Sequence, residues 1–215
     1  FKKCDISDIG AYKGAITYIE DMNGSTEILI NNAADDMRHG WDRVTVEEFD
    51  KRIAVNLRHM FFAIQKVAPG MISAQLGSII NLGSSGWMMN SGGYPVYASA
   101  KAAVCGLTRS FARDLGRNKI RVNTLTPGWV MTEKQLNMWV DDQANISIDN
   151  GQCIPGRVMP EDIANMALFL GSDDSKMSSC QNFIVDGGWA TKRERLENGI
   201  PVPDTLVESF YEDLR

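Results

Sequence analysis

The sequence has few of the residues from which metal and disulfide sites are built. Its 215 residues include four cysteines and two histidines. The cysteines lie far apart and form no CxxC pair, which argues against a zinc site or a disulfide scaffold and is typical of reduced thiols. With only two imidazoles, a histidine-based metal site is not expected. We therefore predict a cytoplasmic protein without a bound metal.

Long hydrophobic runs and a surplus of positive charge are also missing. No apolar stretch reaches the roughly 18 residues needed to cross a bilayer, and the start of the chain has no hydrophobic signal-peptide segment. The formal net charge is -5, so the chain has no excess of basic side chains for neutralising phosphates. Nucleic acids and membranes are therefore not predicted as partners.

Short apolar segments alternate with amphipathic segments along most of the chain. Strands are predicted at 27–30, 78–82, 120–125 and 182–185. Apolar residues at helical spacing predict helices at 7–22, from 45 onward, at 96–115 and at 160–170. This alternation predicts an α/β fold, a Rossmann-type, doubly wound parallel sheet with helices on both faces. The ligand should then bind beyond the carboxyl ends of the strands.

The strongest chemical signal is the pair Tyr97 and Lys101 near the start of a predicted helix. Spacing of i and i+4 places the phenol and the ammonium on one helix face. A nearby cation would lower the tyrosine pKa and make the phenol a usable acid or base. The alternative is an ordinary helix with a surface lysine.

Two further polar residues stand at places that suggest a site. Ser84 follows a predicted strand and precedes Tyr97 by thirteen residues, so its hydroxyl could bind a substrate oxygen or merely serve a turn. Asn56 lies on the apolar side of its helix and should point inward. Its buried amide needs partners, either a backbone group or an ordered water beside the site.

These residues, with their surroundings, resemble the short-chain dehydrogenase/reductase family. The resemblance covers most of the chain, from Cys4 to Gly188, and its ordered motifs include Asn31-Asn32-Ala33-Ala34, Tyr97 to Lys101 and Asp186-Gly187-Gly188. It implies an NAD- or NADP-dependent oxidoreductase acting on a small molecule. It also implies a catalytic tetrad, namely Asn56, Ser84, Tyr97 and Lys101.

The resemblance also implies a set of cofactor contacts. These are Asp5 and Ile6 on the adenine side, then Asn32, Ala33, Ala34, Tyr97, Lys101, Pro127, Gly128, Val130 and Thr132. The family's Gly-rich pyrophosphate loop, TGxxxGxG, does not occur in the sequence. We therefore expect that the N-terminal strand–helix units, about 60 residues, are missing from this chain. Without these units the sequence does not indicate whether the cofactor is NAD or NADP.

A finer resemblance concerns the substrate. The segments Asp35-Asp36-Met37-Arg38-His39 and Val55-Asn56-Leu57-Arg58-His59 are similar to those of bacterial aldose (sugar) 1-dehydrogenases. Trp87 and Trp129 could stack on a sugar face, or they could simply form pocket walls. The alternatives are a 3-oxoacyl or other ketone reductase of the same family and a non-catalytic subunit with this fold.

We predict a catalytic domain over residues 1–190 and a tail over 191–215 with a short amphipathic helix near 205–214. The helices near 45–71 and 96–116 carry more apolar residues than one sheet face requires. This surplus predicts a homo-oligomer, a dimer or a tetramer, in which these helices pair with their symmetry copies. The alternative is that the surplus faces the tail helix.

Overall fold

One parallel sheet organises the molecule. The computed structural model describes residues 1–190 together with 196–197 and 200–201. Its main sheet has the order β1-β2-β3-β4, with every pair parallel. The strands are β1 (Ile28–Asn31), β2 (Gly77–Leu82), β3 (Ile120–Pro127) and β4 (Asn182–Val185). The prediction of a parallel α/β sheet is confirmed, and each strand lies within two residues of its predicted bounds.

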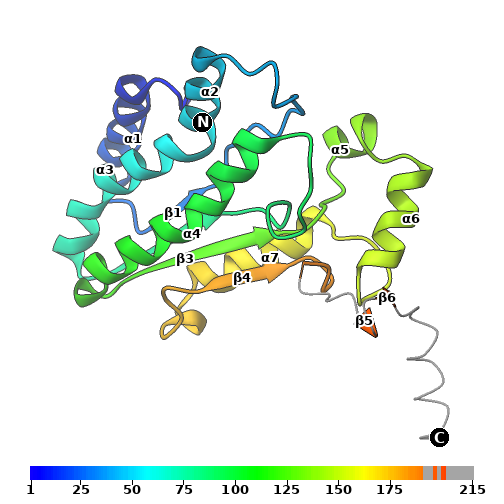
Figure 1. The fold of residues 1–215 in the computed structure, drawn as a ribbon. Helices are drawn as coiled ribbons and strands as arrows, with labels where there is room; N and C mark the ends of the chain where they lie inside the picture. The colour runs from blue at the N-terminus through cyan, green and yellow to red at the C-terminus, as the bar shows by residue number, and fades with distance from the viewer. Residues whose placement is uncertain (191–195, 198–199, 202–215) are drawn as a thin grey trace, which may run out of the picture.

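Helices cover both faces of this sheet (Figure 1). On one face lie α3 (His59–Ala74) and α4 (Pro95–Leu115), with α1 (Ile9–Asn23) packed outside α3. On the other face lies α7 (Pro160–Gly171). Shorter helices are α2 (Val46–Ile53), α5 (Glu133–Met138) and α6 (Asp142–Gly151). No helix among the described residues combines the length and hydropathy needed to span a membrane.

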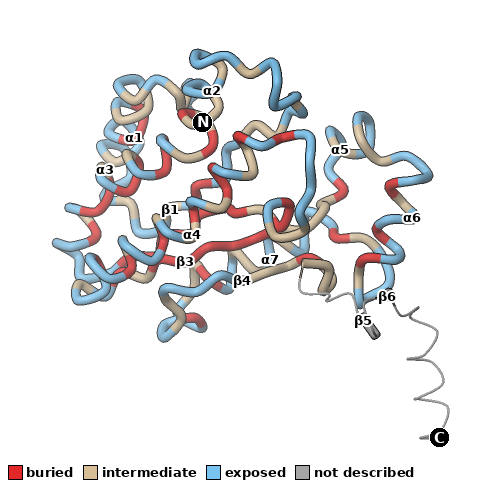
Figure 2. Tube along the Cα trace, in the orientation of Figure 1, coloured by how far each residue is buried: buried red, intermediate tan, exposed pale blue. Residues whose placement is uncertain are grey.

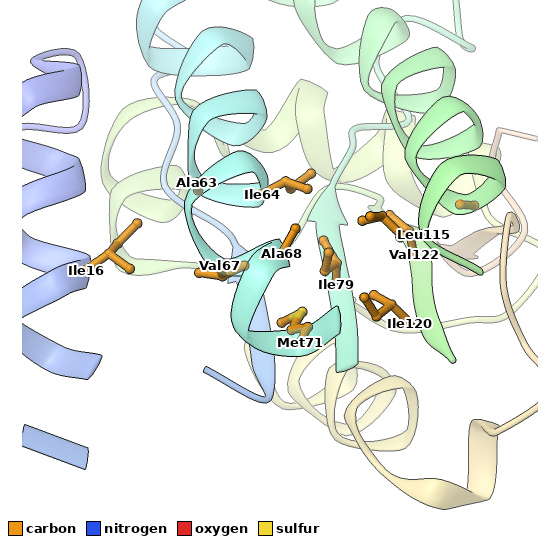
Figure 3. Packing of buried hydrophobic residues seen from close by; sticks show 11 residues of the cluster. Ile16, Ala63, Ile64, Val67, Ala68, Met71, Ile79, Leu115, Ile120 and Val122 are labelled. Carbon is orange, nitrogen blue, oxygen red and sulfur yellow. The ribbon is translucent and has the colours of Figure 1, made fainter. Parts of the chain in front are cut away.

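The core has two layers because neighbouring residues of a strand point to opposite faces. Ile79 packs with α1, α3 and α4, whereas Ile80 packs with Leu170 of α7. Figure 3 shows the first layer, in which Ile16, Val67 and Ile79 meet between the helices and β2. Buried residues follow the sheet and the helix faces turned toward it (Figure 2). These layers hold the carboxyl ends of the strands in fixed positions.

The helix expected from residue 45 is interrupted. Thr45 caps α2 by accepting a hydrogen bond from the Glu48 N–H, as the sequence predicts. A π-helical segment, Ala54–Arg58, then joins α2 to α3. Such wide turns often mark functional sites, and this one contains Asn56. Phe49 of α2 is 46% exposed, so not every apolar residue of this helix faces the core.

The sheet edge at β1 differs from its centre. Within the described part of the chain, β1 pairs with β2 alone. Its Ile28 and Ile30 are about half exposed, at 48% and 47%. At the other end of the chain, β5 (Leu196–Glu197) and β6 (Ile200–Pro201) form a small antiparallel pair. The tail helix predicted near 205–214 lies outside the described residues.

Candidate active site

The start of α4 places the predicted tyrosine and lysine at the carboxyl end of the sheet. Pro95 occupies the first turn of α4, where its missing N–H is not needed. The His39 imidazole accepts a hydrogen bond from the Val96 N–H at 3.2 Å and so acts as the side-chain cap of the helix. The other ring nitrogen of His39 bonds to the Met37 carbonyl at 3.0 Å. A loop distant in sequence therefore fixes the helix end that carries Tyr97.

Tyr97 lies beside Ser84, as the sequence predicts. Burial raises the pKa of Tyr97 to about 12, against the opposing effect of a hydrogen bond from the Ser84 side chain. The prediction that Lys101 lowers the pKa of Tyr97 is therefore wrong in this structure. The Lys101 ammonium stands 5.8 Å from the centre of the tyrosine ring, and removal of the phenol from water is the largest cause acting on the pKa of Tyr97. The neutral phenol is the favoured form.

Lys101 is almost completely enclosed, with 1% of its surface exposed. Its Nζ donates a hydrogen bond of 2.8 Å to the Leu82 carbonyl at the end of β2. Burial lowers the pKa of Lys101 to about 8, although the charge of Asp36 acts in the opposite direction. A buried cation with one protein hydrogen bond and a lowered pKa is typical of functional sites.

Asn56 is fully buried, as predicted, and its side chain bonds to backbone groups. Its Oδ1 accepts from the Asp35 N–H at 2.9 Å. Its Nδ2 donates to the carbonyls of Asp35 and Arg52, at 3.0 and 2.9 Å. Of the two alternatives, the structure places the amide in a backbone network that holds the loop after β1 against the π-helical segment.

A cavity of about 610 Å³ opens beside Tyr97 and Ser84. Trp129 lines it, as predicted, and stacks on Trp189 with ring centres 6.4 Å apart. Gly128, Val130 and Thr132 also line it. Trp87 is not among the lining residues and is 36% exposed, so its assignment to the substrate site stays a prediction.

Charged side chains of this cavity come from segments distant in sequence. Asp36 bonds to Lys134 and to the Gln135 amide, and the same Gln135 accepts from the Trp129 ring N–H at 2.8 Å. Burial alone would raise the pKa of Asp36, but the hydrogen bond and the charge of Lys134 lower it. The Asp36 carboxylate is therefore ionised and already paired.

Arg38 carries the other charge of this cavity. Its guanidinium lies 4.1 Å from the centre of the Tyr94 ring and 5.4 Å from that of Trp139. No ion pair of Arg38 occurs among the described residues. Sequence reasoning singled out the segment of Asp36 and Arg38 by resemblance, but it missed Tyr94, Gln135 and Trp189 as cavity residues.

A second cavity, of about 950 Å³, lies over the strand ends between β1 and α7. It contains several of the predicted cofactor contacts, namely Asn32, Ala34, Tyr97, Lys101, Pro127, Val130 and Thr132. Gly83 also lines it, and a side chain at Gly83 would come within 2.6 Å of Thr126 Oγ1. Ala33 lies next to it in sequence but is not among its lining residues.

Asp5 and Ile6 are not brought to either cavity. Asp5 is exposed and accepts from the Ser7 N–H and hydroxyl, at 2.9 and 2.8 Å, at the start of α1. The hydrogen bonds lower the pKa of Asp5. These two cofactor assignments stay predictions, because the described lining of the large cavity does not include them.

Comparison with known proteins places this geometry in a family. Residues 1–190 match a family model described as "Enoyl-(Acyl carrier protein) reductase". The chain belongs to the short-chain dehydrogenase/reductase family. It is 40% identical over 189 residues to the D-xylose 1-dehydrogenase of Caulobacter vibrioides, covering 88% of this chain and 74% of that protein. It is 38% identical over 188 residues to a probable galactose dehydrogenase of Rhizobium meliloti, covering 87% and 73%.

A solved structure of the same family agrees with the fold. This chain superposes on a gluconate 5-dehydrogenase from Burkholderia cenocepacia, in complex with NADP and tartrate, with a TM-score of 0.82. The sequence identity is 28%, and the match covers 88% of this chain and 74% of that one. As a short-chain dehydrogenase/reductase, the protein is an NAD(P)-dependent oxidoreductase, and the large cavity with its buried lysine fits such a cofactor.

Proposed function

We propose that this short-chain dehydrogenase is a sugar 1-dehydrogenase, which oxidises the hemiacetal carbon of an aldose to a lactone. The observation that carries the proposal is the cavity beside Tyr97, in which the stacked Trp129 and Trp189 face polar and charged groups. An aldose offers an apolar ring face and several hydroxyls, which such a lining can contact. The relatives named as xylose and galactose dehydrogenases support this substrate class.

Tyr97 is the proposed acid–base residue. In the oxidation direction the O–H and C–H bonds of the hemiacetal break, and a carbonyl forms. Tyr97 takes the hydroxyl proton, and a bound nicotinamide supplies the acceptor for the hydride. With a pKa of about 12, Tyr97 is a phenol at neutral pH, so its own proton must first pass to solvent through the cavity that Tyr97 lines before Tyr97 can act as the base. In the reduction direction the phenol is already the required proton donor.

The other members of the proposed tetrad prepare this step. Ser84 is next to Tyr97 and would orient the substrate oxygen toward the phenol. Lys101, whose Nζ lies at the border of the large cavity, would hold the cofactor ribose and place a positive charge near the reacting atoms. Asn56 would act through its backbone bonds to Asp35, which fix the loop between the two cavities.

The large cavity is the proposed cofactor site. Asn32 and Ala34 would face the middle of the dinucleotide, and Val130 with Thr132 its nicotinamide end. Val130 and Thr132 line both cavities, so they stand where cofactor and substrate would meet. Gly128 lines only the substrate cavity, where a side chain would come within 2.7 Å of the Asp186 backbone.

A substrate panel tests the proposal. The protein expressed from its complete gene is assayed with D-xylose, D-galactose and L-arabinose and, in the reverse direction, with 3-oxoacyl thioesters. We expect lactone formation from at least one aldose with kcat/KM at least tenfold above that for the thioesters, a difference of about 1.4 kcal/mol in transition-state binding. Turnover of 3-oxoacyl thioesters alone would favour the alternative of a ketone reductase, the activity named for a 34% identical relative, the 3-oxoacyl-[acyl-carrier-protein] reductase of Chlamydia pneumoniae.

We further propose a homo-oligomer in the cytoplasm. Phe61 of α3 is 42% exposed and contacts Phe111 of α4, with ring centres 5.3 Å apart. An apolar surface shared by these two helices favours burial against a second copy of the chain. Light scattering should give a dimer or a tetramer, and a monomer at micromolar concentration would contradict this proposal. The described cysteines are all free thiols, which agrees with a reducing compartment.

A further inference from the structure

Gln135 of α5 uses both ends of its side-chain amide. Its Oε1 accepts a hydrogen bond from the Trp129 ring N–H at 2.8 Å, and its Nε2 donates one to Asp36 Oδ2 at 2.6 Å. These partners lie 6 and 99 positions away in the sequence. Most side chains bond to backbone groups or to water, so a glutamine held at both ends by other side chains is unusual. It joins two separate parts of the site.

The chemistry of the two partners fixes which way this amide points. An indole N–H is a donor only, and an ionised carboxylate is an acceptor only. Against the effect of burial, the hydrogen bond and the charge of Lys134 lower the pKa of Asp36 and keep its carboxyl ionised. The residue between Trp129 and Asp36 must therefore accept at one end and donate at the other. A leucine does neither, and a glutamate would turn a second carboxylate toward Asp36.

The backbone of Gln135 is held at the same place. Its N–H donates to Thr132 Oγ1 at 3.3 Å, and this contact caps the N-terminus of α5. Lys134 and Gln135, neighbours in the first turn of α5, bond to the two oxygens of Asp36. A helix of 6 residues has little stability of its own and depends on such contacts for its position. The turn after β3, α5 and the loop after β1 therefore meet at Gln135.

Trp129 is the ring whose orientation this arrangement controls. It lines the substrate cavity together with Trp189, and the planes of the two rings are inclined at 24°. The ring N–H is the single polar group of an indole, and here it is bonded to Gln135. Without that bond, packing alone would hold the ring. A ring that is fixed in advance binds a ligand at a lower cost in side-chain ordering.

We propose that Gln135 is a positioning residue of the substrate site, which links Trp129 to Asp36 and so fixes the indole in the orientation that stacks on the sugar. Gln135 lines both the substrate cavity and the cofactor cavity, so it stands in the wall where the two meet. It acts through Trp129 and takes no part in the transfer of the proton or the hydride. The inference rests on the proposed function for the identity of the ligand that stacks on the ring.

The hydrogen bond is tested without an activity assay. In NMR spectra of the isotope-labelled protein, each of the five tryptophans gives one indole N–H signal, and Trp129→Phe identifies the signal of Trp129 by its loss. Hydrogen exchange at this group should become about fivefold faster in Gln135→Leu, as for one lost hydrogen bond. Gln143→Leu, which changes an exposed glutamine of α6, is the matched control. An unchanged exchange rate in Gln135→Leu would overturn the proposal.

Kinetics test whether the orientation of the ring matters. In Gln135→Leu the KM for the sugar should rise about fivefold, with kcat and its pH profile unchanged, because Asp36 and Tyr97 keep their protonation states. Trp129→Phe, which lacks the ring N–H, should also raise KM. The double variant should be no worse than Trp129→Phe alone, since both changes remove the same interaction. Independent, multiplying effects on KM would overturn the proposal.

A charge swap supplies a rescue. Gln135→Glu alone turns two carboxylates toward each other and should raise KM more than Gln135→Leu does. Combined with Asp36→Asn, the same change restores the match of donors and acceptors, because a carboxylate at position 135 accepts both from Trp129 and from an amide at position 36. The number of charges is then that of the wild type, and KM should return toward the wild-type value. A KM that stays as high as in Gln135→Glu alone would overturn the proposal.

Failure of the proposed function gives a different pattern. If the wild type oxidises no aldose, the proposed function is wrong, while the exchange of the indole N–H still tests Gln135. The KM series is then measured with the substrate of the panel that is turned over. If aldoses are oxidised and Gln135→Leu equals the wild type in both assays, only the inference about Gln135 is wrong. Urea unfolding of each variant verifies that the protein is folded.

Discussion

The two histidines of the chain contrast in burial and in their hydrogen bonds. His39, in the loop facing the substrate cavity, bonds through both ring nitrogens, to Met37 and to the Val96 N–H. His59, the buried first residue of α3, has no side-chain hydrogen bond of good geometry, although the Ala54 carbonyl lies close enough to affect its pKa. The same contrast extends to the charges around them, since Asp36 is paired on the cavity side and Lys101 has no carboxylate partner on the buried side.

This contrast distinguishes polar groups that are paired at the cavity from polar groups that are buried without a partner. On the cavity side, water can complete any missing bond, and the polar groups fix loop geometry through pairs. On the buried side, an unpaired group carries a cost of about 1–3 kcal/mol unless water or a ligand completes it. Burial lowers the pKa values of His59 and Lys101, to about 4 and about 8, so the charged forms of both groups are disfavoured on this side.

The largest effect on activity is expected for Tyr97, which lines both cavities. Tyr97→Phe keeps the ring but removes the hydroxyl, so kcat should fall at least 100-fold, the lower end for general acid–base catalysis. The matched control is Tyr18→Phe, which removes the same atom from a half-exposed tyrosine on α1. Near-wild-type turnover in Tyr97→Phe, with circular dichroism unchanged, would show that the tyrosine assignment is wrong.

Acid should destabilise the buried side more than the cavity side. Between pH 6.5 and 4 the unfolded chain protonates His59, whereas the folded protein, with a pKa of about 4, does not. The free energy of unfolding should therefore fall as the pH drops through this window. From pH 7 to 5 the part due to His59 is about 1–2 kcal/mol.

Urea unfolding of wild type and His59→Leu at pH 7, 6 and 5 isolates this contribution. The variant should lose less stability toward pH 5 than the wild type does. In a His39→Gln control, the free energy of unfolding should fall toward pH 5 as much as in the wild type, because His59 is still present. Parallel curves for wild type and His59→Leu would mean that the imidazole is protonated in the folded state, and the buried-side interpretation would fail.

Changes to the charged residues that line the substrate cavity should alter the KM for the sugar. Arg38 lies over the Tyr94 ring and lines the cavity, so Arg38→Ala should raise the sugar KM about tenfold, as for loss of one or two hydrogen bonds to a charged group. Its kcat should change little. Arg43→Ala is the matched control, since Arg43 is in the same loop, with 88% of its side chain exposed. Equal effects of both changes would place Arg38 outside the substrate site.

The smallest effect is expected from the cap of α4. His39→Ala removes the acceptor for the Val96 N–H and should lower the free energy of unfolding by about 1 kcal/mol, as for loss of a side-chain cap. Thr45→Ala, which removes the ordinary cap of α2, gives the comparison. Thermal unfolding of both variants measures the difference. An unchanged melting temperature in His39→Ala would show that water replaces the imidazole.

The local pattern of the sequence determined the frame of this protein. The alternation of strand and helix segments predicted the parallel sheet, and Thr45 indicated where a helix begins. The spacing of Tyr97 and Lys101 placed both residues on one helix at a strand end. Asn56 was identified as buried because its position in the apolar repeat is a local property. Propensity, capping and periodicity act over a few residues, so they can be read without the fold.

Only the tertiary structure decided how the site is charged and what lines it. Asp36, Gln135 and Trp129 form one hydrogen-bonded set from segments about a hundred residues apart in sequence. Trp87 is not among the residues that line the cavity, although it lies close to Ser84 in sequence. The direction of the Tyr97 pKa was predicted wrongly because spacing gives the neighbour but not the burial. Desolvation depends on all the residues that pack around a group, and these come from distant parts of the sequence. For the same reason, only the folded structure shows that the buried ring nitrogens of His59 have no side-chain hydrogen bond of good geometry.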